Sequence, residues 1–184
     1  MSEYVDKRKD YIYYKFLKEL LCILSSEDDE ICDVGSCGVD MLSFLNCKRK
    51  ISIDLETPYI GEDVESIKGD FLGVNLEKIS IYTCFQVLEH IGNNEINDFA
   101  EKLLQASNYT VISVPYMWEK GKCKSHIQDP VDEIKVKSWF ERDTYYKKII
   151  TEKNGIRRMV CVYKNHLDND DSILRQLDVL SQKY

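Results

Sequence analysis

The pattern of apolar and polar positions divides the first third of the chain into four elements. Residues 3–24 repeat apolar side chains at helical spacing and predict an amphipathic helix. A polar run ends this helix, and the apolar run 31–34 predicts the first strand. Residues 39–45 predict a short helix, and residues 50–54 predict a second strand that ends in Asp54.

The middle of the chain continues the alternation of strands and helices. Strands are expected at 64–68, 79–84 and 109–114, and a helix at 95–106. This alternation is typical of a parallel, doubly wound sheet. Residues 115–130 break the pattern with a long irregular segment, which in compact domains is usually functional or disordered.

The last part of the chain predicts a different sheet geometry. After a helix expected at 131–140, the β-rich runs 145–151 and 156–163 flank Asn154-Gly155, a strong signal for a hairpin. The predicted fold class is therefore α/β: a Rossmann-like, three-layer αβα domain whose sheet is mostly parallel and closes with an antiparallel hairpin.

The length of 184 residues fits one domain with a sizeable core. We expect an N-terminal helix within residues 1–26, a core at 31–164 and a polar, helical tail at 165–184. The net charge of −7 argues against a nucleic-acid partner, because such proteins normally present a basic surface to phosphates.

The cysteines and the apolar runs bear on the compartment. The seven cysteines are odd in number and form no C-x-x-C pair, so we expect free thiols rather than disulfides or a zinc site. No apolar run approaches the roughly 18 residues that span a bilayer, and the N-terminus is charged rather than signal-like. These features favour a cytoplasmic protein without a membrane span.

The segment 31–54 carries the first chemical signal, because a strand, a glycine-containing turn, a helix and a second strand follow one another there. Gly35 and Gly38 lack Cβ atoms and would let a ligand approach the backbone. The N-terminus of the expected helix would favour an anionic group. Asp54, at the end of the second strand, could accept both hydroxyls of a ribose, so the segment predicts an adenosine-containing cofactor.

Four segments resemble, in order and spacing, the motifs of class I S-adenosylmethionine-dependent methyltransferases. They are Asp33-Val34-Gly35-Ser36-Cys37-Gly38, Ile53-Asp54, Ile67-Lys68-Gly69-Asp70-Phe71 and Val87-Leu88-Glu89-His90-Ile91. The last segment is similar to the type 11 branch, which modifies small molecules and glycans, and the resemblance covers residues 31–164. Residues 113–118 and 126–132 resemble a bacterial subgroup from surface-polysaccharide biosynthesis clusters.

One departure from the family pattern concerns the first motif, which usually has the form D-x-G-x-G-x-G. Cys37 and Val39 stand where the family has its second and third glycines, with Gly38 between them. Gly38 could take over the positive-φ position of the turn. The alternative is a degraded site that no longer binds the cofactor.

The resemblance implies S-adenosylmethionine as cofactor and S-adenosylhomocysteine as product. Asp54 would hold the ribose, Asp70 would accept from the adenine amino group, and Asp33 would orient the turn or reach the ammonium through water. The implied cofactor residues are Asp33, Gly35, Cys37, Gly38, Asp54, Leu55, Asp70, Phe71, Cys84, Phe85 and Gln86. Each acid could instead anchor a loop or cap a helix, and Phe71 and Cys37 could simply fill space.

His126 is the first candidate for a catalytic base, because an imidazole can take a proton near neutral pH. Asp129 could orient its ring, and His90 is a second candidate base. The alternatives are a surface histidine, a helix cap at Asp129 and a loop-supporting role for His90. His126 and Asp129 could also be two ligands of a divalent cation, but no further ligands cluster near them in the sequence, so no metal site is predicted.

Aromatic residues supply the candidate substrate contacts. Tyr116 and Trp118 could form an apolar wall against a sugar ring, and Tyr14 in the first helix could contribute to a lid. Ordinary packing is the alternative for all three.

The leading hypothesis is a methyltransferase that acts on a small-molecule or saccharide acceptor by O- or N-methylation. A catalytically silent, methyltransferase-like scaffold protein is the alternative, and a homo-oligomer or a partner subunit could complete the site. An NAD-dependent oxidoreductase fits less well, because the first turn lacks G-x-G-x-x-G.

Overall fold

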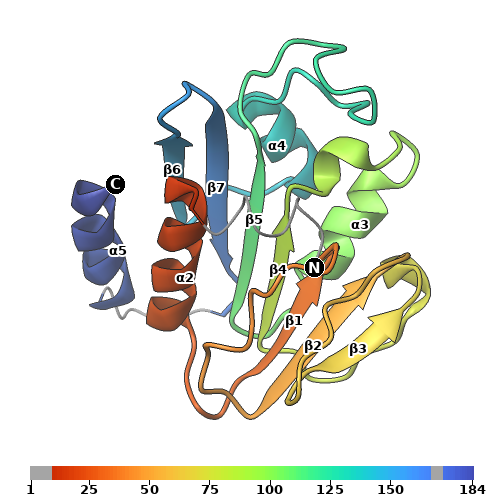
Figure 1. Ribbon diagram of the computed structural model, residues 1–184, viewed down its shortest axis with the longest axis vertical. Coiled ribbons are helices and arrows are strands. Elements are labelled where there is room, and N and C mark those ends of the chain that lie inside the picture. Colours follow the sequence, from red (N-terminus) through yellow and green to blue (C-terminus); the bar gives the residue numbers. More distant parts are fainter. Residues whose placement is uncertain (1–9, 167–171) are drawn as a thin grey trace.

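The computed structural model describes residues 10–166 and 172–184 and contains one seven-stranded sheet (Figure 1). The strands lie in the order β3-β2-β1-β4-β5-β7-β6. They are β1 (Glu30–Val34), β2 (Arg49–Asp54), β3 (Glu65–Lys68), β4 (Ile81–Phe85), β5 (Tyr109–Pro115), β6 (Tyr146–Thr151) and β7 (Arg157–Lys164). The first five pair in parallel, and β7 pairs antiparallel to both β5 and β6. The predicted fold class and the closing hairpin are confirmed.

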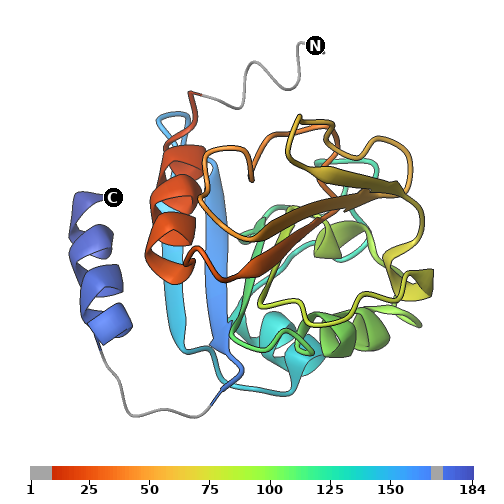
Figure 2. The ribbon, with the colours of Figure 1, turned by 90° about the horizontal axis from the view of Figure 1, so that it is seen from below.

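Helices cover both faces of the sheet (Figure 2). They are α2 (Ile12–Leu24), α3 (Ile96–Leu103), α4 (Glu133–Phe140) and α5 (Ser172–Lys183), with the 3-10 turns η1 (Phe71–Gly73) and η2 (Leu88–His90). One apolar core lies beneath α2 and α5, and a second lies beneath α3 and α4. Strands β4 and β5 are buried along their whole length, which explains their nearly continuous apolar sequence.

The helix expected at residues 39–45 is not formed, and this prediction was wrong. The segment between β1 and β2 is irregular, yet Met41 and Leu42 are buried against the sheet. Asp40 accepts hydrogen bonds from the backbone N–H groups of Leu42 and Ser43, at 3.1 and 2.9 Å. Such local bonding competes with a helix, and the run is too short to compensate for it. No helix N-terminus therefore points at the turn after β1.

The N-terminus of α2 is anchored by a residue from the other end of the chain. Glu152, between β6 and β7, accepts hydrogen bonds from the backbone N–H groups of Ile12 and Tyr13, at 3.0 and 2.9 Å. These are two of the donors that a helix leaves unpaired at its start. Arg158 Nη1 lies 3.7 Å from the same carboxylate. Residues 3–9 of the predicted helix lie outside the described residues.

Of the polar, helical tail predicted at 165–184, residues 172–183 form α5, which is not purely polar, and residues 167–171 lie outside the described residues. Leu177 and Leu180 of α5 are buried and join the core beneath α2. Glu19 of α2 accepts a hydrogen bond from the Tyr184 hydroxyl at 2.7 Å. The segment is therefore packed as part of the domain.

All seven cysteines are free thiols, and Cys32, Cys84 and Cys161 are buried. Within residues 10–166 and 172–184, none of the helices combines the length and apolar character that crossing a membrane requires.

We predict that Glu152→Ala lowers the free energy of unfolding by about 2–4 kcal/mol, because it removes a helix cap and leaves the mostly buried Arg158 without its ion pair. Urea denaturation measures the loss. Glu27→Ala, which removes an exposed carboxylate, is the control and should change stability by less than about 0.5 kcal/mol. Equal stability of the two variants would contradict the anchoring role.

Candidate functional site

A cavity of about 440 Å³ opens at the carboxyl ends of the parallel strands. The strand order reverses between β1 and β4, and ligands of open α/β sheets bind beside such a reversal. The cavity is lined by residues that follow β1, β2, β3 and β4. Seven of the eleven predicted cofactor residues line it: Gly35, Cys37, Asp54, Leu55, Asp70, Phe71 and Gln86.

The turn after β1 approaches the cavity with an unusual backbone. Gly35 has φ +77°, and a Cβ atom built there would lie 2.3 Å from Val87 Cγ2, so only glycine fits. Cys37 and Gly38 both have positive φ, at 49° and 71°. Gly38 thus has the predicted positive φ, and Cys37 has it as well. For a residue with a Cβ this conformation costs about 1–2 kcal/mol.

Asp54 stabilises that turn directly. Its Oδ2 accepts a hydrogen bond from the Cys37 N–H at 2.9 Å. Its Oδ1 accepts from the backbone N–H groups of Glu56 and Thr57, both at 2.9 Å. The carboxylate therefore joins the loop after β1 to the loop after β2. A carboxylate has about four acceptor sites, so three donors leave room for a ligand.

Asp70 and Phe71 form the wall of the cavity after β3. Asp70 Oδ1 accepts from the Leu72 N–H at 3.0 Å and so caps η1. The Phe71 ring packs against Phe99, with ring centroids 4.9 Å apart. Lys102 Nζ donates a hydrogen bond to the Phe71 carbonyl at 2.6 Å and so stabilises the turn η1. The wall combines an apolar ring with a carboxylate, a pairing suited to a heteroaromatic base with an amino group.

Gln86, at the end of β4, closes the other side of the cavity. It too has positive φ, at 60°. Its N–H donates to the Ser113 carbonyl at 2.9 Å, and its Oε1 accepts from Arg158 Nε at 3.2 Å. The preceding residues Cys84 and Phe85 are buried in the two cores and do not line the cavity.

Asp33 does not line the cavity either. Its side chain is buried and accepts a hydrogen bond from Thr83 Oγ1 of β4 at 2.6 Å. Burial raises the pKa of this carboxyl to about 7, and the Thr83 hydrogen bond opposes that shift. The bond anchors the end of β1 just before the Gly35 turn.

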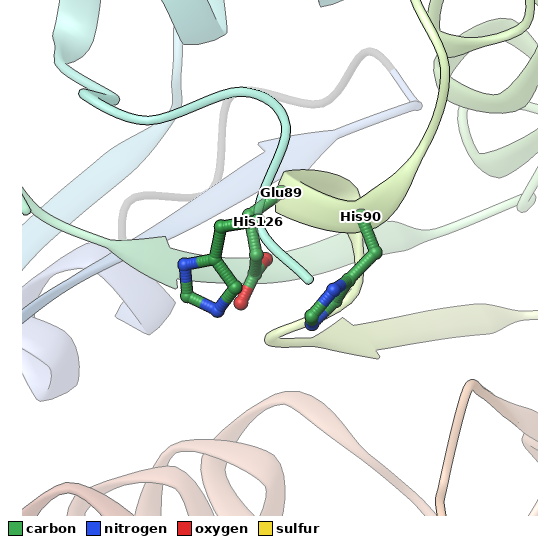
Figure 3. Close-up of side chains that lie close together, drawn as sticks. All are labelled: Glu89, His90 and His126. Atoms are coloured by element: carbon green, nitrogen blue, oxygen red, sulfur yellow. The ribbon is translucent and has the colours of Figure 1, made fainter. Parts of the chain in front are cut away.

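His90 lines the cavity, and His126 lies directly beside His90. His126 Nδ1 is 2.8 Å from Asp129 Oδ2, the pairing that the sequence suggested. The rings of His90 and His126 meet edge to face, with centroids 4.8 Å apart. Figure 3 shows that Glu89 joins them. We call Glu89, His90 and His126 the histidine cluster.

Glu89 is not among the site residues that the sequence predicts. The signal was available in the adjacent pair Glu89-His90, which one short turn after β4 carries to the edge of the sheet. His90 lines the cavity, and burial lowers its pKa. The neutral imidazole is therefore favoured, which leaves a nitrogen lone pair for a proton or a cation.

The three aromatic residues predicted to contact the substrate, Tyr14, Tyr116 and Trp118, lie in different parts of the structure. Trp118 stacks on His126, with centroids 5.5 Å apart and planes at 29°. The Tyr116 hydroxyl instead donates to Glu133 Oε2 at 3.2 Å, and its ring lies under Arg157. Tyr14 is buried in the core beneath α2 and does not line the cavity. Trp118 is therefore the aromatic candidate whose described contacts include the histidine cluster.

No protein-family model and no curated protein matches the chain. Solved structures do match. The N-methyltransferase NodS from Bradyrhizobium japonicum gives a TM-score of 0.63 at 10% identity, over 90% of this chain and 99% of that one. Magnesium protoporphyrin IX methyltransferase from Synechocystis, with bound S-adenosylhomocysteine, gives 0.63 at 12% identity, over 84% and 83%.

A third similar structure is the methyltransferase partner of the Trm112 methyltransferase activator from Haloferax volcanii. It gives a TM-score of 0.64 at 11% identity, over 86% of this chain and 91% of that one. At these identities the likeness concerns the fold. The chain has the fold of class I S-adenosylmethionine-dependent methyltransferases, and the resemblance noted in the sequence is confirmed at this level.

We predict that Asp33→Asn stabilises the protein relative to wild type as the pH rises. The native carboxyl has a pKa of about 7 against an ordinary 3.8, so the native state holds a proton that the unfolded chain releases earlier. This contribution to stability is complete below the ordinary pKa and is lost as the pH rises through about 7. From about pH 5 to about pH 8, the variant should gain roughly 2–3 kcal/mol over wild type.

Urea denaturation at the two pH values measures this difference for wild type, Asp33→Asn and the exposed control Asp98→Asn. The control should follow wild type. The same pH dependence in all three proteins would contradict a raised Asp33 pKa.

Proposed function

We propose that the protein is an S-adenosylmethionine-dependent methyltransferase that modifies a small-molecule or saccharide acceptor. One observation carries the proposal: a single cavity at the reversal of strand order brings together the turn after β1, Asp54, Asp70 and Gln86. Its volume of about 440 Å³ lies within the usual range of about 300–1,000 Å³ for small-molecule sites.

The residues of the cavity match the parts of the cofactor. Asp54 would accept a hydrogen bond from a ribose hydroxyl at the one acceptor site that its three backbone bonds leave free. Asp70 and Phe71 would hold the adenine, with the exposed side chain of Leu55 on its other side. Gly35, Cys37 and Gln86 would border the methionine part. When bound, the cofactor supplies a methyl group on a sulfonium, a centre that needs alignment more than chemical activation.

The acceptor would enter at the histidine cluster. Trp118 supplies an aromatic face there, of the kind that packs against a sugar ring. His126, oriented by Asp129, and His90 both present a nitrogen lone pair at this end of the cavity and are the candidates to assist an acceptor hydroxyl or amine. This placement supports O- or N-methylation of a compact acceptor.

A methyltransferase-like binding subunit is the second candidate. The missing helix after β1 and the strained Cys37 both favour it, since each departs from a standard cofactor turn. Leu55 and Ile60 are apolar residues with 63% and 81% exposure on the loop after β2, where a partner protein could cover them. The H. volcanii neighbour was solved with an activator protein.

We predict that S-adenosylhomocysteine binds with micromolar affinity in a calorimetric titration and that Asp54→Ala weakens the binding about 100-fold. The carboxylate has about one acceptor site left for a ribose hydroxyl, and a hydrogen bond to a charged group contributes about 1.5–3 kcal/mol, whose upper end corresponds to two powers of ten. Glu56→Ala is the matched control, because it removes a neighbouring carboxylate whose Lys68 ion pair is exposed.

Asp54 also supports the Cys37 turn, so thermal unfolding of Asp54→Ala must be recorded alongside the titration. Weaker binding by a variant that remains folded supports the ribose contact. The absence of binding by folded wild-type protein would overturn the proposed function in favour of the binding-subunit candidate.

A further inference from the structure

The histidine cluster has the composition of a metal site. One potential ligand atom each from Glu89, His90 and His126 lies within 4.8 Å of the others (Figure 3). Glu89 and His90 belong to η2, whereas His126 lies in the loop that follows β5. That loop is held in place because the N–H groups of Ile127 and Gln128 donate to the Glu89 carbonyl, at 2.9 and 3.2 Å.

Hydrogen bonds fix which nitrogen of each ring is free. His90 Nδ1 lies 3.0 Å from the Ser125 carbonyl oxygen, which can only accept, so Nδ1 carries the hydrogen. His126 Nδ1 faces the Asp129 carboxylate in the same way. With each Nδ1 used in this way, Nε2 is the nitrogen of each ring that is left to bind a cation, and neither Nε2 has a hydrogen-bond partner within the described part of the chain.

The position of His126 is set by buried neighbours. The Asp129 side chain is 0% exposed and that of His126 is 7% exposed. Asp129 Oδ1 has no hydrogen-bond partner among the described residues, so within them the carboxylate is hydrogen-bonded to His126 through Oδ2. A carboxylate on the far nitrogen of an imidazole fixes its tautomer and strengthens it as a metal ligand. Trp118 covers the face of the same ring.

We propose that Glu89, His90 and His126 bind one divalent transition-metal ion. Two imidazoles and one carboxylate suit ions such as Mn²⁺, Co²⁺ or Zn²⁺, whereas Mg²⁺ prefers oxygen ligands alone. Ligands about 2.1 Å from a tetrahedral ion lie about 3.4 Å apart. Because His90 is exposed and Glu89 is buried, we expect His90 to make most of the adjustment that closes the remaining distance, by a small movement that keeps its hydrogen bond to Ser125.

The site adjoins the cavity, because His90 belongs to both. Resting on the proposed function, the ion would bind an acceptor hydroxyl next to the methyl donor. Coordination lowers the pKa of the hydroxyl, whose proton passes to solvent, and the resulting oxyanion is the nucleophile. A nitrogen that is bound to the ion cannot also take a proton, so this assignment replaces His126 and His90 as bases.

The test uses the full chain after dialysis against a chelator. Mn²⁺ is titrated first, followed by the loss of its free-ion paramagnetic resonance signal, because Mn²⁺ has little affinity for the exposed thiols of Cys22 and Cys37. Co²⁺ is then added, and its visible absorption reports the ligand geometry. We expect one ion per chain.

Variants separate the cluster from other sites. Glu89→Gln keeps the shape of the buried side chain, and His90→Ala alters an exposed one, so both should fold. Each should weaken Mn²⁺ binding more than about 100-fold, and Asp129→Asn about 10- to 100-fold, since it acts on His126 only through orientation. His166→Ala, which removes the histidine outside the cluster, should bind Mn²⁺ as wild type does.

A titration with S-adenosylhomocysteine on the same samples keeps the two proposals apart. Wild-type protein that binds S-adenosylhomocysteine but not Mn²⁺ or Co²⁺ overturns the metal site alone. Binding of one Mn²⁺ that is lost in Glu89→Gln supports the site, even if S-adenosylhomocysteine fails to bind. Unchanged Mn²⁺ binding in both Glu89→Gln and His90→Ala also overturns it.

Discussion

The carboxylate of Asp54 makes the three hydrogen bonds on which the cofactor side of the site depends. In this chain no helix follows the turn after β1, so the turn has no helical backbone to hold it. Asp54 replaces that support by accepting from Cys37 on one side and from Glu56 and Thr57 on the other. Asp54, which would bind the ribose, thus also stabilises the loop that would surround the ribose. Both roles use the lone pairs of the same carboxylate.

Backbone strain is concentrated in the lining of the cavity. Cys37 and Gln86 have positive φ without being glycines, and both line the cavity. Such conformations persist only where neighbouring contacts outweigh their cost, and they gather at ligand sites. Here the contacts are the Asp54 bond for Cys37 and the Ser113 and Arg158 bonds for Gln86. These hydrogen bonds hold the strained residues Cys37 and Gln86, which follow β1 and β4, in the lining of the same cavity.

The strands, their parallel order and the closing hairpin could be predicted because each depends on a local pattern: buried apolar runs, alternation with helices, and Asn154-Gly155. The false helix at 39–45 had the right apolar spacing, but Asp40 offered the backbone a competing set of bonds. Asp54 and Asp70 could be placed because one ends a strand and the other follows a strand by two residues. The partnership of Glu89 with His126 could not, since 36 positions separate them and only the folded loop after β5 brings them together.

The chemistry proposed for the acceptor end of the cavity depends on which nitrogen of each imidazole is free of hydrogen bonds. A general base needs one free lone pair and a path for its proton, and a single oriented histidine would provide both. The structure instead brings one potential ligand atom from each imidazole and one from the buried Glu89 carboxylate within 4.8 Å of one another, and the Nδ1 of each ring faces a different hydrogen-bond acceptor. A general base gains nothing from a second imidazole beside it, whereas one divalent ion could take a ligand atom from all three side chains at once. The geometry therefore favours a cation over a proton at this end of the cavity.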